Sequence, residues 1–108
     1  MRVLFVDDNA MNRKVVQGML GAADVSMVDA ESAEIGLELI AADHFDLILM
    51  DLRMPGMDGL AAIRAIRARD DAKARLPIIV VTADNAPDIR SRALAAGADD
   101  LLHKPVQM

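Results

Sequence analysis

The chain has 108 residues, of which 54% are hydrophobic and 27% are charged, with a net charge of -5. This length suffices for one domain with a hydrophobic core but is too short for two, and the acidic balance lacks the broad positive surface that direct binding to nucleic acid requires. With no cysteine, the chain forms neither a disulfide framework nor a thiolate metal site. The N-terminal apolar run is only four residues long, so we expect neither a signal peptide nor a membrane span. We therefore expect a cytoplasmic protein with a single domain, residues 1–108.

Five short apolar runs alternate with amphipathic stretches along the chain. Runs with apolar residues on both faces are typical of strands buried in a parallel sheet. They lie at residues 3–6, 25–28, 47–50, 78–81 and 101–102. Between the runs, apolar residues recur at helical spacing. The alternation predicts an α/β domain with helices on both faces of a parallel sheet.

The first helical stretch has apolar residues at helical spacing, namely Met11, Val15 and Met19 with Val16 and Leu20. We expect Met11, Met19 and Met27 to fill the core, because methionine adapts to irregular gaps between side chains. The basic stretch at residues 63–75 is expected to be the solvated face and end of a helix rather than a nucleic-acid patch.

Residues that favour helix ends separate the predicted elements. Asn, Ser and Asp cap helix starts, Pro suits a first turn, and Gly is common just after a helix. In chain order these residues are Asn9, Gly21, Ser32, Asp58, Pro87 and Gly97. Only "HKPVQM" remains after the fifth run, so we expect no closing helix and a partly uncovered sheet.

Polar side chains follow four of the five predicted strands. Asp7 and Asp8 come after the first strand, Asp51 after the third, Thr82 at the end of the fourth and Lys104 after the fifth. Ligands of open parallel sheets bind at the carboxyl ends of the strands. We therefore expect three carboxylates, one hydroxyl and one ammonium group to meet at one edge.

This set of groups is suited to phosphate chemistry. Clustered carboxylates repel one another unless a cation lies among them, and oxygen ligands suit Mg²⁺. Lys104 offers a positive charge and Thr82 a hydroxyl donor for an anion bound to the same metal. Asp51 stands alone after its strand and is the candidate nucleophile for a phosphoryl group. Each residue alone has an ordinary structural explanation, such as a helix cap for Asp7 and Asp8, but their coincidence at one edge favours function.

Four segments carry a family resemblance: "LFVDDNAMNR", "DLILMDLRMPGMDG", "PIIVVTA" and "GADDLLHKP". In this order, across almost the whole chain, they resemble the motifs of response-regulator receiver domains. The resemblance implies a flavodoxin-like doubly wound five-stranded parallel sheet with strand order 2-1-3-4-5, here with the usual last helix missing or truncated. "DDNAMNR" is most similar to receivers of bacterial hybrid histidine kinases or to stand-alone relay receivers.

The resemblance also implies roles for the site residues. Asp51 would be the phosphoacceptor. Mg²⁺ would be bound by Asp8 directly, by Asp7 partly through water, and by Asp51 and the backbone carbonyl of Arg53. Lys104 would pair with the phosphoryl group.

Further implied roles concern the conformational switch and the lifetime of the phosphorylated state. Thr82 would move to hydrogen-bond the phosphoryl group, and a cis peptide between Lys104 and Pro105 would aim the lysine into the site. Leu101 stands where the family usually has Tyr or Phe, so a rotating ring cannot carry the signal. Arg53 and Asp84 occupy positions that tune the lifetime, and Pro55 and Gly56 shape the turn beside the acceptor.

The implied function is a two-component phosphorelay step. A histidine kinase or histidine phosphotransfer protein would donate a phosphoryl group to Asp51 in a Mg²⁺-dependent reaction, and the receiver would change conformation and signal to an effector or output domain. It would catalyse only its own phosphorylation and dephosphorylation, without direct contact with nucleic acid or membrane. Its oligomeric state stays open.

Two alternatives remain. One is a pseudo-receiver that binds partners without phosphorylation, which Leu101 leaves open. The other is an aspartate-nucleophile phosphatase of the haloacid-dehalogenase type. Those enzymes have a second Asp as acid and base two residues after the nucleophile, where this chain has Arg53.

Overall fold

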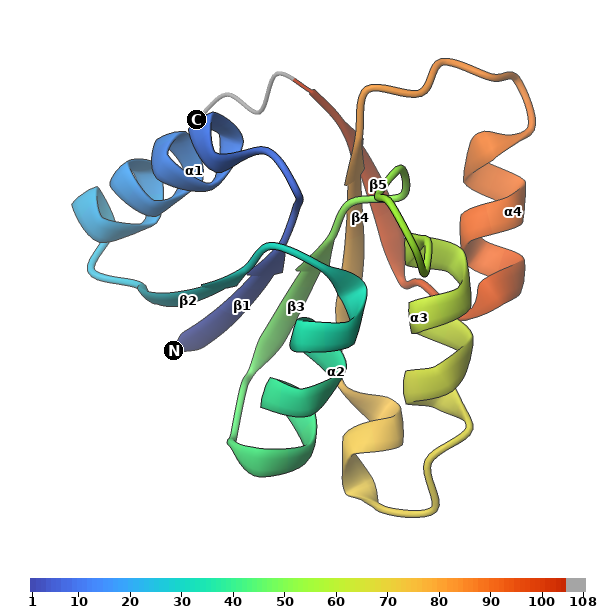
Figure 1. Cartoon of the computed structure of the whole chain (residues 1–108), viewed down its shortest axis with the longest axis horizontal. Coiled ribbons are helices and arrows are strands. Elements are labelled where there is room, and N and C mark those ends of the chain that lie inside the picture. The colour runs from blue at the N-terminus through green and yellow to red at the C-terminus, as the bar shows by residue number, and fades with distance from the viewer. Residues whose placement is uncertain (105–108) are drawn as a thin grey trace.

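A five-stranded parallel sheet forms the centre of the computed structural model, which describes residues 1–104 (Figure 1). The strands are β1 (Arg2–Val6), β2 (Ser26–Ala30), β3 (Leu47–Met50), β4 (Ile78–Thr82) and β5 (Asp100–His103). The helices are α1 (Ala10–Ala22), α2 (Ala33–Ala42), α3 (Gly59–Arg67) and α4 (Ile89–Ala96), with the 3₁₀ helix η1 (Ala72–Arg75). The strand order is β2-β1-β3-β4-β5, which confirms the predicted alternation and the flavodoxin-like fold.

The two faces of the sheet bury different side chains because successive residues of a strand point to opposite sides. Leu4, Val6 and Ile48 belong to the larger core, which lies between the sheet and α2, α3 and α4. Phe5 and Val81 form a smaller core with α1 on the other face. Figure 1 shows α1 apart from the other three helices. The sequence expectation of helices on both faces is therefore confirmed.

The face beside α1 is only partly covered. An apolar groove of about 230 Å³ lies there between α1 and strands β3 to β5, and Leu102 is 44% exposed. Its lining is Val16, Met19, Leu20, Leu47, Leu49, Ile79, Val81 and Leu102. Strand β5 is the last element within residues 1–104.

The predicted helix starts are confirmed at α1, α2 and α3. The side chains of Asn9, Ser32 and Asp58 each accept a hydrogen bond from the backbone N–H three residues later, at 3.1, 3.1 and 2.8 Å. Such caps satisfy N–H groups that have no partner within the helix.

The predictions for the other helix ends are confirmed only in part. Gly97 ends α4 with a φ of +120°, which favours glycine. Gly21 does not end α1, because the helix continues to Ala22 and the positive φ falls instead on Asp24. Pro87 precedes the first turn of α4 instead of lying in it, since Asp88 is the cap residue.

The expectation that Met11 lies in the core is wrong. Met11 is 67% exposed and Val15 51% exposed. Residue 16 is the buried position of α1, and Leu20, one turn later, packs against the same small core. Of the apolar positions predicted for this helix, α1 therefore buries Val16 and Leu20 against the sheet and leaves Met11 and Val15 exposed. Met19 and Met27 are half-buried, in partial agreement with the prediction.

The basic stretch at residues 63–75 is not simply solvated. The Nζ of Lys73 donates hydrogen bonds to the backbone carbonyls of Ile40, at 2.6 Å, and Asp43, at 3.0 Å, at the C-terminus of α2. The guanidinium of Arg67 donates to the carbonyls of Gly97 and Leu76, at 2.8 and 2.6 Å. These two cations join elements of the fold, which explains their presence without a nucleic-acid partner.

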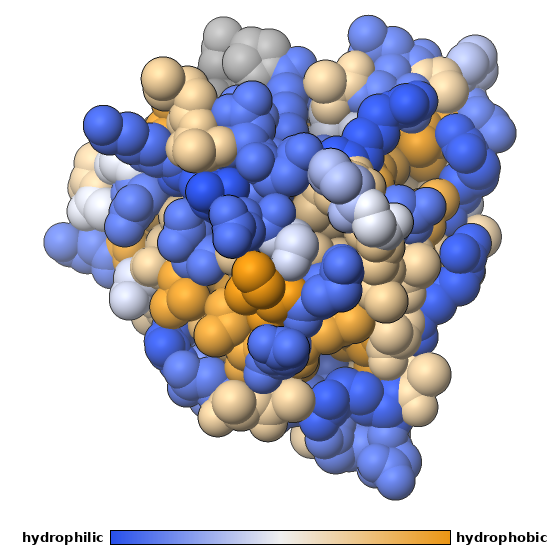
Figure 2. Space-filling model, in the orientation of Figure 1, coloured by the Kyte–Doolittle hydropathy of each residue, from blue (hydrophilic) through white to orange (hydrophobic). Residues whose placement is uncertain are grey.

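The surface in the view of Figure 2 is mostly hydrophilic, with an apolar area over α2. Ile35 in α2 is one of the exposed apolar side chains, and isolated ones are common on protein surfaces. Among the described residues, no helix combines the length and the apolar character that crossing a bilayer demands.

Candidate functional site

Sheet pairing brings the three acidic residues together. Val6 of β1 is in register with Met50 of β3, so Asp7 and Asp51 leave neighbouring strands at the same level. One carboxylate oxygen of each of Asp7, Asp8 and Asp51 lies within 4.8 Å of the others. Asp7 is fully buried and Asp51 is 5% exposed, while Asp8 faces solvent. The predicted acidic cluster is present at the carboxyl edge of the sheet.

Lys104 reaches this cluster from the end of β5. Its Nζ donates a hydrogen bond to Asp7 Oδ2 at 2.7 Å and forms an ion pair with Asp51 Oδ2 at 3.4 Å. The backbone N–H of Lys104 donates to the carbonyl of Thr82 at 2.8 Å, which fixes the end of β5 against β4. The expected cis peptide involves Pro105, which lies outside the described residues.

Asp51, Thr82 and Lys104 line one cavity of about 360 Å³, together with Arg53, Ala83 and Asp84. Thr82 is buried, and its Oγ1 accepts a hydrogen bond from the N–H of Asp84 at 3.1 Å. All of the side chains predicted from the sequence to share a site therefore meet at one place.

Asp7 is held by more donors than sequence reasoning anticipated. Its Oδ1 accepts from the N–H of Asn9 at 2.9 Å, and its Oδ2 accepts from Asn12 Nδ2 at 3.3 Å as well as from Lys104. Its backbone carbonyl accepts from Arg13 Nη1 at 2.7 Å. Asn12 and Arg13 belong to the "DDNAMNR" motif. Their position about one helical turn after the two acids is the sequence feature that could have predicted these contacts with Asp7.

Asp51 has an unusual protonation equilibrium. Burial, and then the negative charge of Asp7, raise the pKa of the Asp51 carboxyl to about 6, while Lys104 and the N–H of Leu52 act in the opposite direction. A cation placed among the carboxylates would favour the ionised form of all three. Three oxygen ligands with excess negative charge fit Mg²⁺ well.

A glycine that sequence reasoning missed lets the backbone at Asp51 pack against the start of α3. The N–H of Gly59 donates to the carbonyl of Leu52 at 3.0 Å. A Cβ at residue 59 would lie 2.1 Å from the carbonyl oxygen of Asp51, a distance that no side chain tolerates. Gly59 is the second glycine of "GMDG", and this glycine at the start of a predicted helix is the sequence feature that could have indicated the close approach. Gly56, predicted to shape the turn, has a φ of +79°.

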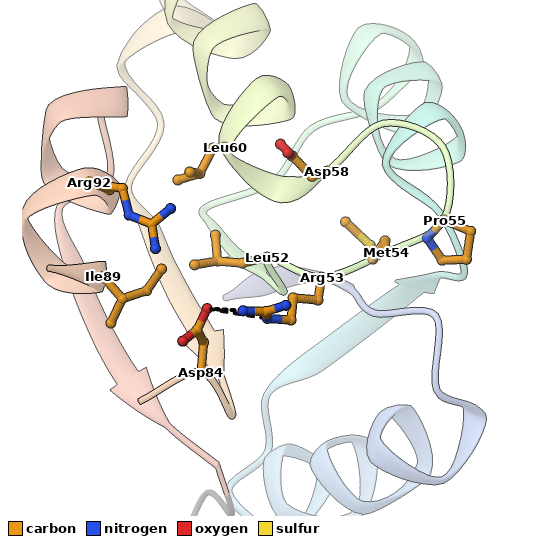
Figure 3. Close-up of a pocket in the computed structure, with 9 residues that line it drawn as sticks. All are labelled: Leu52, Arg53, Met54, Pro55, Asp58, Leu60, Asp84, Ile89 and Arg92. Carbon is orange, nitrogen blue, oxygen red and sulfur yellow. Dashed lines mark hydrogen bonds and ion pairs between the residues drawn. The ribbon is translucent and has the colours of Figure 1, made fainter. Parts of the chain in front are cut away.

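Arg53 and Asp84 form an ion pair in the lining of the cavity that also contains Asp51, Thr82 and Lys104. Arg53 Nη2 donates to Asp84 Oδ2 at 2.7 Å, and Asp84 Oδ1 accepts from the N–H of Ala86 at 2.9 Å. The Ala86 N–H and then the Arg53 guanidinium lower the pKa of the Asp84 carboxyl. Both partners also line a second pocket of about 520 Å³. Figure 3 shows this pair, marked by a dashed line, at one end of the pocket, and Leu60 of α3 and Arg92 of α4 at another part of its lining.

Leu101 lies in β5 beside Val80 of β4 and is buried in the larger core. Its aliphatic side chain packs like other core residues.

The comparison with protein families gives one match over nearly the whole chain. The family described as the response regulator receiver domain matches residues 3–108. Sensor histidine kinase AruS of Pseudomonas aeruginosa is 41% identical over 109 residues, which are 100% of this chain and 11% of that protein. The chain spans 3%, 12% and 15% of three other sensor proteins that it matches.

Solved structures with the same fold include two receivers. Chemotaxis protein CheY4 of Vibrio cholerae has a TM-score of 0.90 and 29% identity, over 98% of this chain and 88% of that one. The receiver domain of a sensor histidine kinase of Pseudomonas aeruginosa has a TM-score of 0.88 and 34% identity, over 98% and 86%. That receiver was solved with a magnesium ion coordinated in its active site cleft.

Proposed function

Because the chain belongs to the response regulator receiver domain family, we propose that it accepts a phosphoryl group on Asp51 from a phosphohistidine protein in a Mg²⁺-dependent reaction. The observation that carries this proposal is the cavity shared by Asp51, Thr82 and Lys104 next to the acidic cluster. It combines a carboxylate nucleophile with a hydroxyl and an ammonium group that bind phosphate oxygens.

Asp7, Asp8, Asp51 and the carbonyl of Arg53 would hold Mg²⁺. When bound, the ion neutralises negative charge on the transferring phosphoryl oxygens. In the absence of the cation, the cluster is partly compensated by Lys104. The carboxylates of Asp7, Asp8 and Asp51 supply oxygen ligands only, which favours a hard divalent cation over zinc or copper.

The two oxygens of Asp51 have different surroundings, and this difference supports one of them as the nucleophile. Oδ1 accepts the N–H of Leu52 at 2.9 Å, whereas Oδ2 faces Lys104. We assign the attack to Oδ2. The phosphorus–nitrogen bond of the donor breaks as the bond between Oδ2 and phosphorus forms, and the imidazole leaves with the electron pair and takes up a proton. Lys104 then stabilises the phosphoryl oxygens.

The conformational response would begin at Thr82. A phosphoryl group on Asp51 offers a strong acceptor to the Thr82 hydroxyl, whose oxygen now accepts from the N–H of Asp84. Rotation of Thr82 would loosen that contact and with it the turn before α4, which Asp84 also supports through Ala86. Signalling by this route needs no aromatic ring at position 101.

The exposed side of α1 supports a protein donor. Met11 and Val15 are four residues apart, on one helix face, and both are exposed. Gly18 continues this face, and apart from its chain neighbours and the backbone of its own helix nothing lies within 4 Å of its Cβ position, although glycine inside a helix costs about 1 kcal/mol. An apolar strip with a small residue permits close approach of another helix. We propose that the histidine-bearing helix of the donor docks here, near Asp8.

The test is the intact mass of the protein after incubation with a small-molecule phosphodonor, with and without Mg²⁺. We expect one phosphoryl adduct that requires both Mg²⁺ and Asp51. Asp51→Asn should abolish it, while Asp70→Asn, which removes an exposed carboxylate from the loop after α3, should leave it intact. An adduct that survives Asp51→Asn would refute the assignment. No adduct under any condition would favour a phosphorylation-independent interaction module.

A further inference from the structure

Arg13 joins three elements behind the acidic cluster. It lies in the first turns of α1, and its side chain is only 15% exposed. Nη1 donates to the backbone carbonyl of Asp7 at 2.7 Å, and Nε donates to Asp29 Oδ2 at 2.9 Å. Because Asp29 belongs to β2 and Asp7 follows β1, the guanidinium fork spans the ends of two neighbouring strands.

The Asp7 peptide is thereby fixed on both sides. Its N–H donates to the carbonyl of Ala30 at 3.0 Å, and its carbonyl accepts from Arg13. The direction of a side chain follows from the backbone that carries it, so these two bonds aim the Asp7 carboxylate toward Asp51. They also set the start of the turn in which Asp8 presents its carboxylate.

We propose that Arg13 is a positioning residue for divalent-cation binding, acting by holding the Asp7 carbonyl against β2 through Asp29. This inference rests on the proposed Mg²⁺ function of the cluster. Arg13 is itself a cation and would not be a ligand of the metal. Its function is that of the outer-shell partners that orient metal ligands.

The direction in which Mg²⁺ affinity changes when Arg13 is replaced distinguishes positioning of Asp7 from a purely electrostatic effect of the guanidinium charge. A guanidinium group near the cluster repels a second cation, so loss of its charge alone would strengthen Mg²⁺ binding. Loss of the orienting hydrogen bonds would weaken it. Arg13→Met removes both charge and hydrogen bonds, whereas Arg13→Lys keeps the charge and loses the planar fork.

Isothermal titration of the 108-residue chain with MgCl₂ provides the test, since the chain has no Trp or Tyr for fluorescence. We expect Arg13→Met and Arg13→Lys each to raise the Mg²⁺ Kd about tenfold. Arg69→Met and Arg69→Lys are matched controls. Arg69 makes a similar fork to Asp71, at 3.0 and 2.6 Å, in the loop after α3, and its loss should leave the Kd unchanged.

Tighter Mg²⁺ binding by Arg13→Met, or an unchanged Kd in Arg13→Lys, would overturn the proposal, even if the melting temperature falls. Should Arg13→Met not fold, Arg13→Lys decides the matter. The amide resonance of Asn9, whose N–H donates to Asp7 Oδ1, should shift in the metal-free Arg13 variants. If the wild type itself binds no Mg²⁺, the proposed function fails; if it binds and Arg13→Lys binds equally, only this inference fails.

Discussion

Lys104 lies closer to Asp7 than to the proposed acceptor Asp51, with Nζ at 2.7 Å from Asp7 Oδ2 and 3.4 Å from Asp51 Oδ2. One ammonium group therefore compensates two buried carboxylates. A phosphoryl group on Asp51 would draw Lys104 away from Asp7 and leave Asn12 as a donor to the same Oδ2. The charge balance at Asp7 and the chemistry at Asp51 are coupled through this lysine.

Replacing Lys104 tests the coupling. Lys104 lowers the pKa of Asp51 against the opposing effects of burial and Asp7. Lys104→Met should therefore raise the pKa of Asp51 above its value of about 6, as followed by carboxyl carbon NMR during a pH titration without metal. Lys14→Met, on α1, serves as the control and should leave the titration unchanged. A lower pKa in Lys104→Met would contradict the arrangement.

Asp51 makes the metal-free fold sensitive to pH. Its folded-state pKa of about 6 lies above the ordinary value of 3.8, so the carboxyl group contributes stability below the ordinary pKa and loses that contribution as the pH rises through 6. At pH 7 in EDTA, Asp51→Asn should be more stable than the wild type by about 2 kcal/mol. At pH 4 the difference should largely disappear.

Urea unfolding at both pH values measures this difference. Asp70→Asn, in an exposed position, should change the free energy of unfolding little at either pH. A wild type that exceeds Asp51→Asn in stability at pH 7 without metal would show that the cluster carries no electrostatic strain.

Mg²⁺ should offset the loss of folding stability that ionisation of Asp51 causes at neutral pH. A cation among Asp7, Asp8 and Asp51 favours the ionised carboxylates and should lower the pKa of Asp51. It should also raise the melting temperature, because it binds the folded state. Calorimetry with and without MgCl₂ at pH 7 checks this, and Asp8→Asn should reduce the shift. An equal shift in Asp8→Asn would exclude that carboxylate as a ligand.

The fold and most of the site follow from local sequence patterns. Apolar runs on five strands set the sheet, and parallel pairing necessarily brings Asp7 and Asp51 to one edge. The wrong prediction for Met11 has a physical cause. The predicted apolar positions of α1 include both Met11 and Val16, which lie on different sides of the helix, and periodicity alone does not reveal which side meets the sheet.

The supporting residues depend on tertiary contacts and escaped prediction. Arg13 owes its position to Asp29 of β2, and Lys73 to carbonyls 30 to 33 residues earlier in the chain. Gly59 is required because the carbonyl of Asp51 approaches it from a preceding turn. Such contacts join residues far apart in the chain, so no local sequence pattern predicts them.

Gly59 therefore gives a stringent test of packing at the acceptor. Gly59→Ala places a methyl group 2.1 Å from the Asp51 carbonyl oxygen, so the backbone must move. We expect a loss of about 1 to 3 kcal/mol in the free energy of unfolding and slower phosphorylation by a small-molecule donor. Gly18→Ala is the matched control. It lies in open space in α1 and should stabilise the chain by about 1 kcal/mol.

The exposed strip of α1 predicts a difference between donors. Met11→Gln combined with Val15→Thr should slow phosphoryl transfer from a histidine phosphotransfer protein that phosphorylates the wild type. The rate with a small-molecule donor should stay the same, because neither side chain lines the acceptor cavity. Leu94→Gln, at another exposed apolar site in α4, is the control and should change neither rate. If the α1 variant loses both rates equally, the strip affects the acceptor itself and the donor helix docks elsewhere.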